Sequence, residues 1–166
     1  MHSIITFLST NDIMVQMGLQ LGGPVCTSFA DIGTGLGKVT AHVLAAHKKV
    51  MVEGIEISPN RWYLSVLATR TLHTNGIDAC RCMLKLGDLS ATTIAASVVY
   101  SFDIAFPDAD MLAYANVFNS SPATRVLVSF YKPSLVVGKF GFDVNPVAVL
   151  RGLKMHGSQS GKVGDE

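Results

Sequence analysis

The sequence predicts an α/β fold with a doubly wound, mostly parallel sheet, in a single domain that spans residues 1–166. Apolar runs rich in β-branched and aromatic residues alternate with segments of helical pattern along the chain. A glycine-rich turn at 33–37 directly follows one of these runs. Hydrophobic residues make up 49% of the chain, which suits a parallel sheet covered on both faces.

Start and stop signals set the boundaries of the expected helices. Residues 9–12 offer several N-caps for an apolar helix over 13–21, and 1–24 is expected to form a helical lead-in. Ser58-Pro59 begins a helix that Asn75-Gly76 ends. The expected elements are then a strand over 27–32, a helix over 38–47, strands over 50–57 and 79–86 separated by the helix 59–74, at most a short helix within 91–96, a strand over 98–103, a helix that includes 114–118, and a strand over 125–130. The tail, 157–166, reads as disordered.

The glycine turn has the spacing of a nucleoside-binding site. The segment 29–38 reads F-A-D-I-G-T-G-L-G-K, and Glu56 ends the next apolar run 19 positions after Gly37. Glycines there let the backbone turn sharply and approach a ligand, and the acid binds ribose hydroxyls. The alternative is a glycine-rich turn without a ligand.

Two residues indicate which nucleoside is bound. Lys38 stands where a dinucleotide fingerprint has Gly or Ala, and Asp31 precedes the first glycine by two positions. A carboxylate at this turn repels a pyrophosphate and attracts an ammonium group. S-adenosylmethionine carries an ammonium and no phosphate, so it is the expected cofactor, and a nicotinamide oxidoreductase is the weaker alternative.

The motif D-x-G-x-G-x-G resembles the first motif of the class I methyltransferases, which have a Rossmann-like fold. More narrowly, the chain from about 28 to 158 resembles the non-SET histone lysine methyltransferases, the disruptor-of-telomeric-silencing family. The segments that carry this narrower resemblance are 29–38, 54–56, 87–88, 98–106, 125–129 followed by Lys132-Pro133, and 153–158.

The resemblance implies a role for each matching residue. Glu56 would bind the ribose and Asp88 the adenine amino group, with Ile57 and Leu89 beside the ring. The residues implied to surround the methionine part are Asp31, Gly33, Thr34, Gly35, Leu36 and Gly37.

Methyl transfer to lysine requires a neutral amine. An apolar channel favours the neutral form by desolvation, and Tyr100, Phe102 and Phe106 are expected to form part of one, with Phe106 as its wall. Asp103 is the candidate to orient the amine or accept its proton; the alternative is an acid that ends the strand and caps the next segment. Asp103 and Phe106 are thus the expected catalytic residues.

The chain also departs from that family. Phe102-Asp103 stands where the family carries paired asparagines, only about 27 residues precede the first expected strand, and the chain ends at 162–166, where a last antiparallel strand would be expected. Two functions therefore stay open: a protein-lysine methyltransferase with a protein substrate, such as a histone, and a non-catalytic, cofactor-binding remnant that acts as an interaction module.

The charge, hydropathy and cysteine content of the chain limit the kinds of partner, site and location that we expect. The formal net charge is +1 and no long Lys/Arg run occurs, so neither direct nucleic-acid binding nor a nucleic-acid methyltransferase is expected. No apolar run reaches the ~18 residues of a membrane span. Cys26, Cys80 and Cys82 show no metal-site spacing and are expected to be buried free thiols, with Cys80 and Cys82 on one face of a strand. An intracellular protein is expected, nuclear if it acts on histones and otherwise cytoplasmic.

Overall fold

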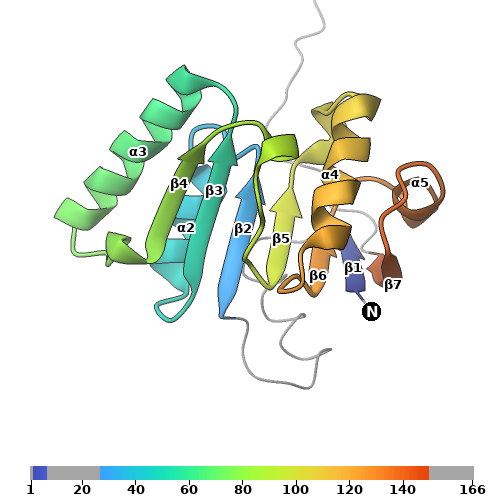
Figure 1. Cartoon of the computed structure of the whole chain (residues 1–166). Coiled ribbons are helices and arrows are strands. Elements are labelled where there is room, and N and C mark those ends of the chain that lie inside the picture. The colour runs from blue at the N-terminus through green and yellow to red at the C-terminus, as the bar shows by residue number, and fades with distance from the viewer. Residues whose placement is uncertain (1, 7–26, 150–166) are drawn as a thin grey trace, which may run out of the picture.

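The described residues, 2–6 and 27–149 of the computed structural model, form one seven-stranded sheet. Its strands are β1 (His2–Thr6), β2 (Ser28–Ile32), β3 (Met51–Glu56), β4 (Cys82–Leu86), β5 (Val98–Ser101), β6 (Val126–Val128) and β7 (Val144–Val149). Their order is β4-β3-β2-β5-β6-β1-β7, and every pair of neighbours is parallel (Figure 1). The predicted doubly wound parallel sheet is confirmed.

Helices cover both faces of the sheet, as the alternation of strands and helices predicts. The helix α2 (Lys38–Ala46) packs on one face, where Val43 and Leu44 join a core with Phe29 of β2. The helix α4 (Asp108–Ser120) packs on the opposite face, where Tyr114 and Phe118 join a second core (Figure 1). Because strand side chains alternate between the faces, each central strand contributes to both cores.

The chain winds in two directions from the middle of the sheet. From β2 it runs through α2, β3 and α3 (Pro59–Thr74) to the edge strand β4, and from β5 it runs through α4 to β6 on the other side. The strand order therefore reverses between β2 and β5. In open α/β sheets such a point is where ligands bind, at the carboxyl ends of the strands.

Most of the predicted boundaries hold, and α3 has the predicted bounds. The strand expected over 79–86 begins only at Cys82, because the 3-10 turn η1 (Ala79–Arg81) precedes it and Asp78 caps this turn by accepting a hydrogen bond from the Cys80 amide at 3.1 Å. Cys80 and Cys82 therefore do not share a strand face. The expectation of buried thiols is wrong for Cys80, which is exposed, while Cys82 is half-buried; Cys26 lies outside the described residues.

The strand expected over 98–103 is also shorter than predicted. It ends at Ser101, and the 3-10 turn η3 (Asp103–Ala105) follows. The short helix expected within 91–96 is replaced by the 3-10 turn η2 (Leu89–Ala91) and an irregular segment. The helix α5 (Pro133–Gly138) was not predicted.

The two ends of the chain differ most from expectation. Residues 2–6, expected to belong to a helical lead-in, form β1, which lies between β6 and β7 and pairs in parallel with both. The strand β7 was not predicted, and the described residues contain no antiparallel strand pair. The expected helix over 13–21 and the expected disordered tail lie outside the described residues.

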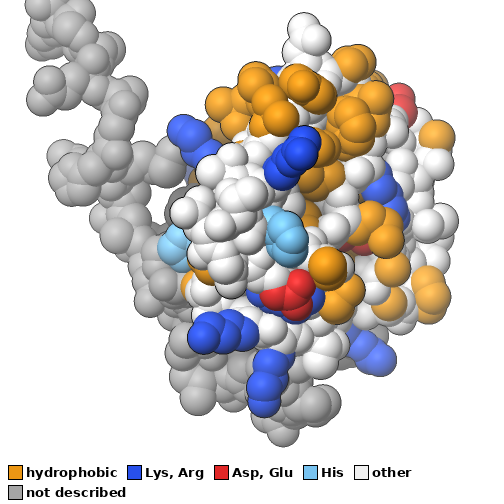
Figure 2. All heavy atoms as spheres, turned by 90° about the vertical axis from the view of Figure 1, so that its left-hand side faces the viewer, with side chains coloured by type: hydrophobic (Ala, Val, Ile, Leu, Met, Phe, Trp, Pro, Cys, Tyr) orange, Lys and Arg blue, Asp and Glu red, His pale blue; other side chains and the backbone are white. Residues whose placement is uncertain are grey.

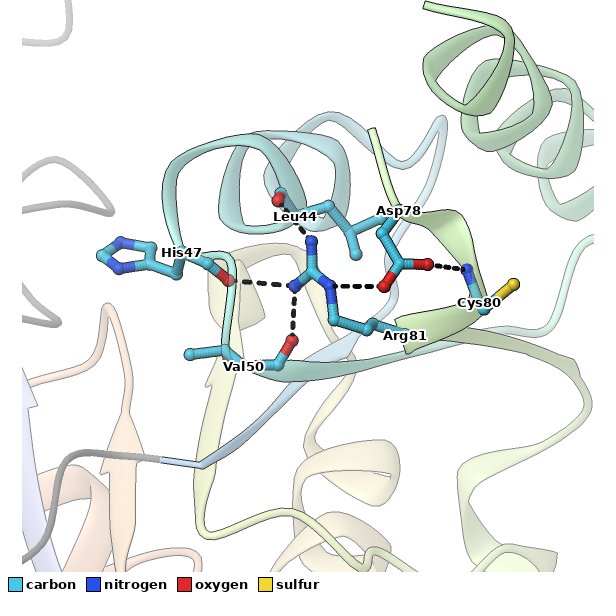
Figure 3. Close-up of polar contacts among 6 residues, drawn as sticks. All are labelled: Leu44, His47, Val50, Asp78, Cys80 and Arg81. Carbon is cyan, nitrogen blue, oxygen red and sulfur yellow. Dashed lines mark hydrogen bonds and ion pairs between the residues drawn. The ribbon is translucent and has the colours of Figure 1, made fainter. Parts of the chain in front are cut away.

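Arg81 joins the ends of several elements of the fold (Figure 3). Its Nη2 donates to the carbonyl of Leu44 at 2.9 Å, and its Nη1 donates to the carbonyls of His47 at 2.9 Å and Val50 at 2.8 Å. Its Nε lies 3.5 Å from a carboxylate oxygen of Asp78. This residue, Arg81, thus ties the last turn of α2 and the approach to β3 to the segment that begins β4.

The outer edge formed by α3 and β4 carries apolar side chains on its surface. Figure 2 views this edge and shows hydrophobic side chains gathered over it. The exposed members are Tyr63, Leu64, Leu67, Met83 and Leu86. The Trp62 indole links α3 to β4 by donating a hydrogen bond to the carbonyl of Leu84 at 3.1 Å.

None of the helices in 2–6 and 27–149 has both the length and the apolar character needed to cross a bilayer.

Candidate cofactor site

The glycine turn lies where the strand order reverses, directly after β2. Gly33, Gly35 and Gly37 have φ values of 71°, 57° and 75°, a region that residues with a Cβ rarely adopt. The amides of Gly33 and Thr34 both donate to the carbonyl of Ile55, at 2.9 and 3.0 Å. These bonds hold the turn against the end of β3.

Glu56 connects this turn to the start of α3. The residue is only 2% exposed, and its Oε2 accepts a hydrogen bond from the Gly35 amide at 2.8 Å. Its Oε1 accepts from the Ser58 amide at 2.9 Å and lies 3.1 Å from Nη2 of Arg61. A carboxylate offers about four lone-pair sites, so Glu56 retains acceptor capacity for a ribose hydroxyl.

A pocket of about 250 Å³ opens beside Glu56. It is lined by all four residues expected to bind the ribose and the adenine ring. The lining is Ile32, Gly33, Ile55, Glu56, Ile57, Arg61, Gly87, Asp88, Leu89, Ser90, Phe106, Asp110 and Ala113. We call this the nucleoside pocket; its lining combines carboxylates with apolar side chains that a flat ring could contact.

Asp88 stands at the edge of the nucleoside pocket and caps η2. Its Oδ1 accepts hydrogen bonds from the amide and the hydroxyl of Ser90, both at 2.8 Å. These bonds hold the pKa of Asp88 below its usual value. Within the described residues Oδ2 accepts no hydrogen bond, so it is available to accept one from an amino group of a ligand.

A second hollow of about 280 Å³ lies on the other side of the glycine turn. It is lined by Asp31, Gly33, Thr34, Leu36, Lys38, Val39, Tyr100 and Phe102. The two hollows share Gly33. The expected cofactor residues are thus divided between them, with Gly33 at the junction.

Asp31 is buried at the inner end of the second hollow. Its Oδ2 accepts hydrogen bonds from the hydroxyls of Thr34 at 2.9 Å and Thr40 at 3.2 Å. Burial raises the pKa of Asp31 to about 6, although the two threonine hydroxyls oppose this shift and the nearby charge of Glu56 adds to it. The group is therefore mostly ionised at pH 7.

Two of the expected cofactor-binding residues line neither hollow. Gly37 lines neither hollow: a Cβ there would stand 2.9 Å from the Cβ of Ser65, so this glycine permits α2 and α3 to pack closely. Gly35 also lies outside both linings, and it contributes the amide that binds Glu56.

The aromatic residues expected to form one channel are divided in the same way. Phe106 lines the nucleoside pocket, whereas Tyr100 and Phe102 line the second hollow. Both of the latter rings pack edge-to-face on Phe130, with centroids 6.1 and 4.5 Å away. The glycine turn stands between the two groups.

Asp103 is fully buried and lines neither hollow. Its Oδ1 accepts a hydrogen bond from the Phe130 amide at 2.9 Å, and its Oδ2 is buried without a hydrogen bond from any described residue. Burial raises the pKa of Asp103 to about 6, against the opposing effect of Ser129 and the Phe130 amide. In this position Asp103 holds the ends of β5 and β6 together, and its catalytic role stays a prediction.

Solved methyltransferase structures share the fold of this chain. The plantazolicin methyltransferase BpumL in complex with SAH matches with a TM-score of 0.56 and 13% identity over 78% of this chain. The methyltransferase domain of bacterial CtHen1-CN matches with a TM-score of 0.55 and 13% identity over 72% of this chain. The mitomycin 7-O-methyltransferase MmcR matches with a TM-score of 0.52 and 22% identity over 72% of this chain. The chain has the class I methyltransferase fold.

These matches cover only part of each solved structure. The chain spans 49% of BpumL, 63% of the CtHen1 domain and 37% of MmcR. No protein-family model and no curated protein sequence matches the chain. At identities of 13–22% the likeness establishes the fold.

Sequence reasoning missed two charged residues of the nucleoside pocket in this methyltransferase fold. Arg61 lies in the first turn of α3, three positions after Ser58, and Asp110 lies in the first turn of α4. The run Pro107-Asp108-Ala109-Asp110 carried a signal, because acidic residues favour the first turn of a helix. A helix predicted to begin at Asp108 would have placed Asp110 in its first turn, near the end of β5.

We expect Gly33→Ala to lower the free energy of unfolding by about 2 kcal/mol, measured by urea denaturation. The alanine would adopt a strained positive φ, and its Cβ would stand 2.9 Å from the Phe106 ring. Gly35→Ala is the matched control, because it carries the same type of strain but its Cβ meets nothing nearer than 3.9 Å; it should cost about 1 kcal/mol. Equal losses in the two variants would contradict the close packing of Phe106 on the turn.

Proposed function

We propose that this protein binds S-adenosylmethionine and transfers its methyl group. The observation that carries the proposal is Glu56, which is held between the glycine turn and the start of α3 with acceptor capacity left at the rim of the nucleoside pocket. With a ribose beside Glu56, the adenine ring would lie within the lining that includes Ile57, Leu89 and Phe106. Oδ2 of Asp88 would then be an acceptor for the adenine amino group.

The residues present fit this cofactor. Gly33, which has no side chain, lines both hollows, and the Phe106 ring packs against it. When bound, S-adenosylmethionine supplies a methyl group on a positively charged sulfur. The protein's contribution to such a transfer is mainly to position the acceptor and to exclude water.

More specifically, we propose that the methyl group is accepted by a lysine of a protein substrate, such as a histone. This part of the proposal rests on the family resemblance. A lysine of pKa near 10.4 must lose its proton, which costs about 4.6 kcal/mol at pH 7 (3.4 units at 1.36 each). Tyr100 and Phe102 offer apolar surface that would lower this cost by desolvation. Phe102 is 43% exposed and accessible to an incoming side chain.

A second candidate is a cofactor-binding module without catalysis. The position of Asp103 favours it, since this carboxyl is fully buried against Phe130 and lines neither hollow. Cofactor binding without transfer of a labelled methyl group to histones or other proteins would support this second function over the first.

The test is calorimetric titration of the protein with S-adenosylmethionine, with Glu56→Gln alongside. We expect the variant to bind at least tenfold more weakly, which is about 1.4 kcal/mol, because an amide accepts fewer hydrogen bonds than a carboxylate. Glu53→Gln is the control: it lies on the same strand but pairs with Lys85 and lines neither hollow. Absence of binding by the unaltered protein would overturn the proposal.

A further inference from the structure

The carboxylate proposed to bind the ribose is paired with a cation of the same pocket. Nη2 of Arg61 lies 3.1 Å from Oε1 of Glu56, and both residues line the nucleoside pocket. The Glu56 side chain is only 2% exposed, whereas that of Arg61 is 57% exposed. Because a buried carboxylate without a partner is costly, Arg61 stabilises the charged form of Glu56.

The two oxygens of Glu56 have few acceptor sites left. Oε2 accepts a hydrogen bond from the Gly35 amide at 2.8 Å, and Oε1 accepts one from the Ser58 amide at 2.9 Å. Since a carboxylate has about four lone-pair sites, these bonds leave one site on each oxygen. Arg61 occupies the site on Oε1. The two hydroxyls of a ribose can therefore both donate to Glu56 only if Arg61 moves away.

Arg61 is not needed to hold Glu56 in place. The two backbone amides bind one oxygen each, and they come from the glycine turn and from the residue that precedes α3. A carboxylate that is bound at both oxygens keeps its orientation when a third partner leaves. The contact with Arg61 thus compensates the charge of Glu56 and does not orient it.

The position of Arg61 in its helix favours its release. It is the third residue of α3, whose first turn contains no acidic residue. The N-terminal end of a helix carries a partial positive charge, so a cation there is unfavourable. Because the guanidinium is more than half exposed, water solvates it as soon as it leaves Glu56. A ligand hydroxyl therefore competes with a weakly held partner.

We propose that Arg61 is a built-in competitor for the ribose, and that the cofactor binds by displacing it from Oε1 of Glu56. The inference rests on the proposed function and adds Arg61 as a residue that sets the affinity for the cofactor. The competition applies only to ligands with both ribose hydroxyls, because a ligand without them leaves the ion pair intact. Loss of the arginine should thus strengthen the binding of one class of ligand and leave the other unchanged.

The experiment compares two nucleosides that differ only in these hydroxyls, adenosine and 2′,3′-dideoxyadenosine, together with S-adenosylhomocysteine. Their affinities are measured by calorimetry for the unaltered protein and for Arg61→Met. We expect the variant to bind adenosine and S-adenosylhomocysteine about threefold more tightly, the effect that a partly exposed ion pair provides. Its affinity for dideoxyadenosine should not change. Arg70→Met is the matched control, because this exposed arginine of α3 does not line the nucleoside pocket, and it should change no affinity.

Salt dependence gives a second measurement, which needs no variant. Neither nucleoside is charged at pH 7, so salt acts on the difference between them through the charges of the protein. Raising the ionic strength from about 0.01 to about 1 M weakens the pair of Arg61 and Glu56, and the affinity for adenosine should rise relative to that for dideoxyadenosine. Weaker binding of adenosine by Arg61→Met, an equal gain for both nucleosides, or a ratio of affinities that does not depend on salt would overturn the role of Arg61.

The failure of this inference differs from a failure of the proposed function. If S-adenosylhomocysteine binds with the same affinity to the unaltered protein and to Arg61→Met, the nucleoside pocket stands and the competition by Arg61 is wrong. If neither protein binds it, the proposed function is wrong and this inference with it.

Discussion

Replacing Arg81 with methionine is expected to lower the free energy of unfolding by about 3 kcal/mol. The guanidinium donates to three backbone carbonyls, those of Leu44, His47 and Val50, and its side chain is only 12% exposed. Hydrogen bonds from a charged donor contribute about 1.5–3 kcal/mol each, and water recovers part of this loss. Methionine retains the apolar length of the side chain, so the variant removes mainly the donors. Urea denaturation measures the change.

Asp78→Asn is the control for the contribution of the ion pair between Asp78 and Arg81. Asp78 is 60% exposed and lies 3.5 Å from Nε of Arg81, and pairs of this kind contribute about 0–1 kcal/mol. Asparagine can still accept the hydrogen bond from the Cys80 amide. A loss in Asp78→Asn as large as that in Arg81→Met would show that the ion pair, and not the bonds to the carbonyls, stabilises the fold.

The free energy of unfolding is expected to fall as the pH rises from 5 to 7. The pKa values of Asp31 and Asp103 lie at about 6 in the folded protein, against 3.8 for an unperturbed aspartate. Between these values the folded state holds protons that the unfolded state has lost, so ionisation on raising the pH costs stability. Each carboxyl contributes at most about 3 kcal/mol over the whole window and about 1 kcal/mol between pH 5 and 7.

Asp103→Asn isolates one of the two groups. Its amide oxygen can still accept the hydrogen bond from the Phe130 amide, but the residue no longer titrates. Unfolding curves at pH 5 and 7 should therefore show a pH dependence smaller by about 1 kcal/mol than in the unaltered protein. The lowered pKa of His47 acts in the opposite direction, and it cancels because it is common to both proteins. An unchanged pH dependence would contradict the raised pKa of Asp103.

Local sequence signals were sufficient to predict the central part of the fold. Glycines with positive φ, the proline after Ser58 and the runs of β-branched residues act within a few residues of chain, so the turn at 33–37 and α3 were predicted with their bounds. The acidic residues at the ends of the predicted strands could also be recognised in the sequence. Because parallel strands align their carboxyl ends, Asp31, Glu56 and Asp88 could be assigned to one edge from the sequence.

The strands β1 and β7 could not be predicted in this way. β1 and β7 are far apart in the sequence, and each is completed by hydrogen bonds to a partner that the chain reaches only after folding. Pairing of this type depends on which sheet edge is open, which no local pattern encodes. The same holds for Asp103, whose amide partner at Phe130 is 27 positions away.

The sequence by itself determined the α/β class, the glycine turn and the chemical types of the groups around it, because these depend on backbone conformation and residue identity over short distances. Only the tertiary structure decided how those groups are divided. It placed Glu56, Asp88 and Phe106 in one hollow, Asp31 and Lys38 in another, and Asp103 in neither. The physical reason is that the side chains at the strand ends and in the turn point to both sides of one glycine turn, so residues close in sequence line different cavities.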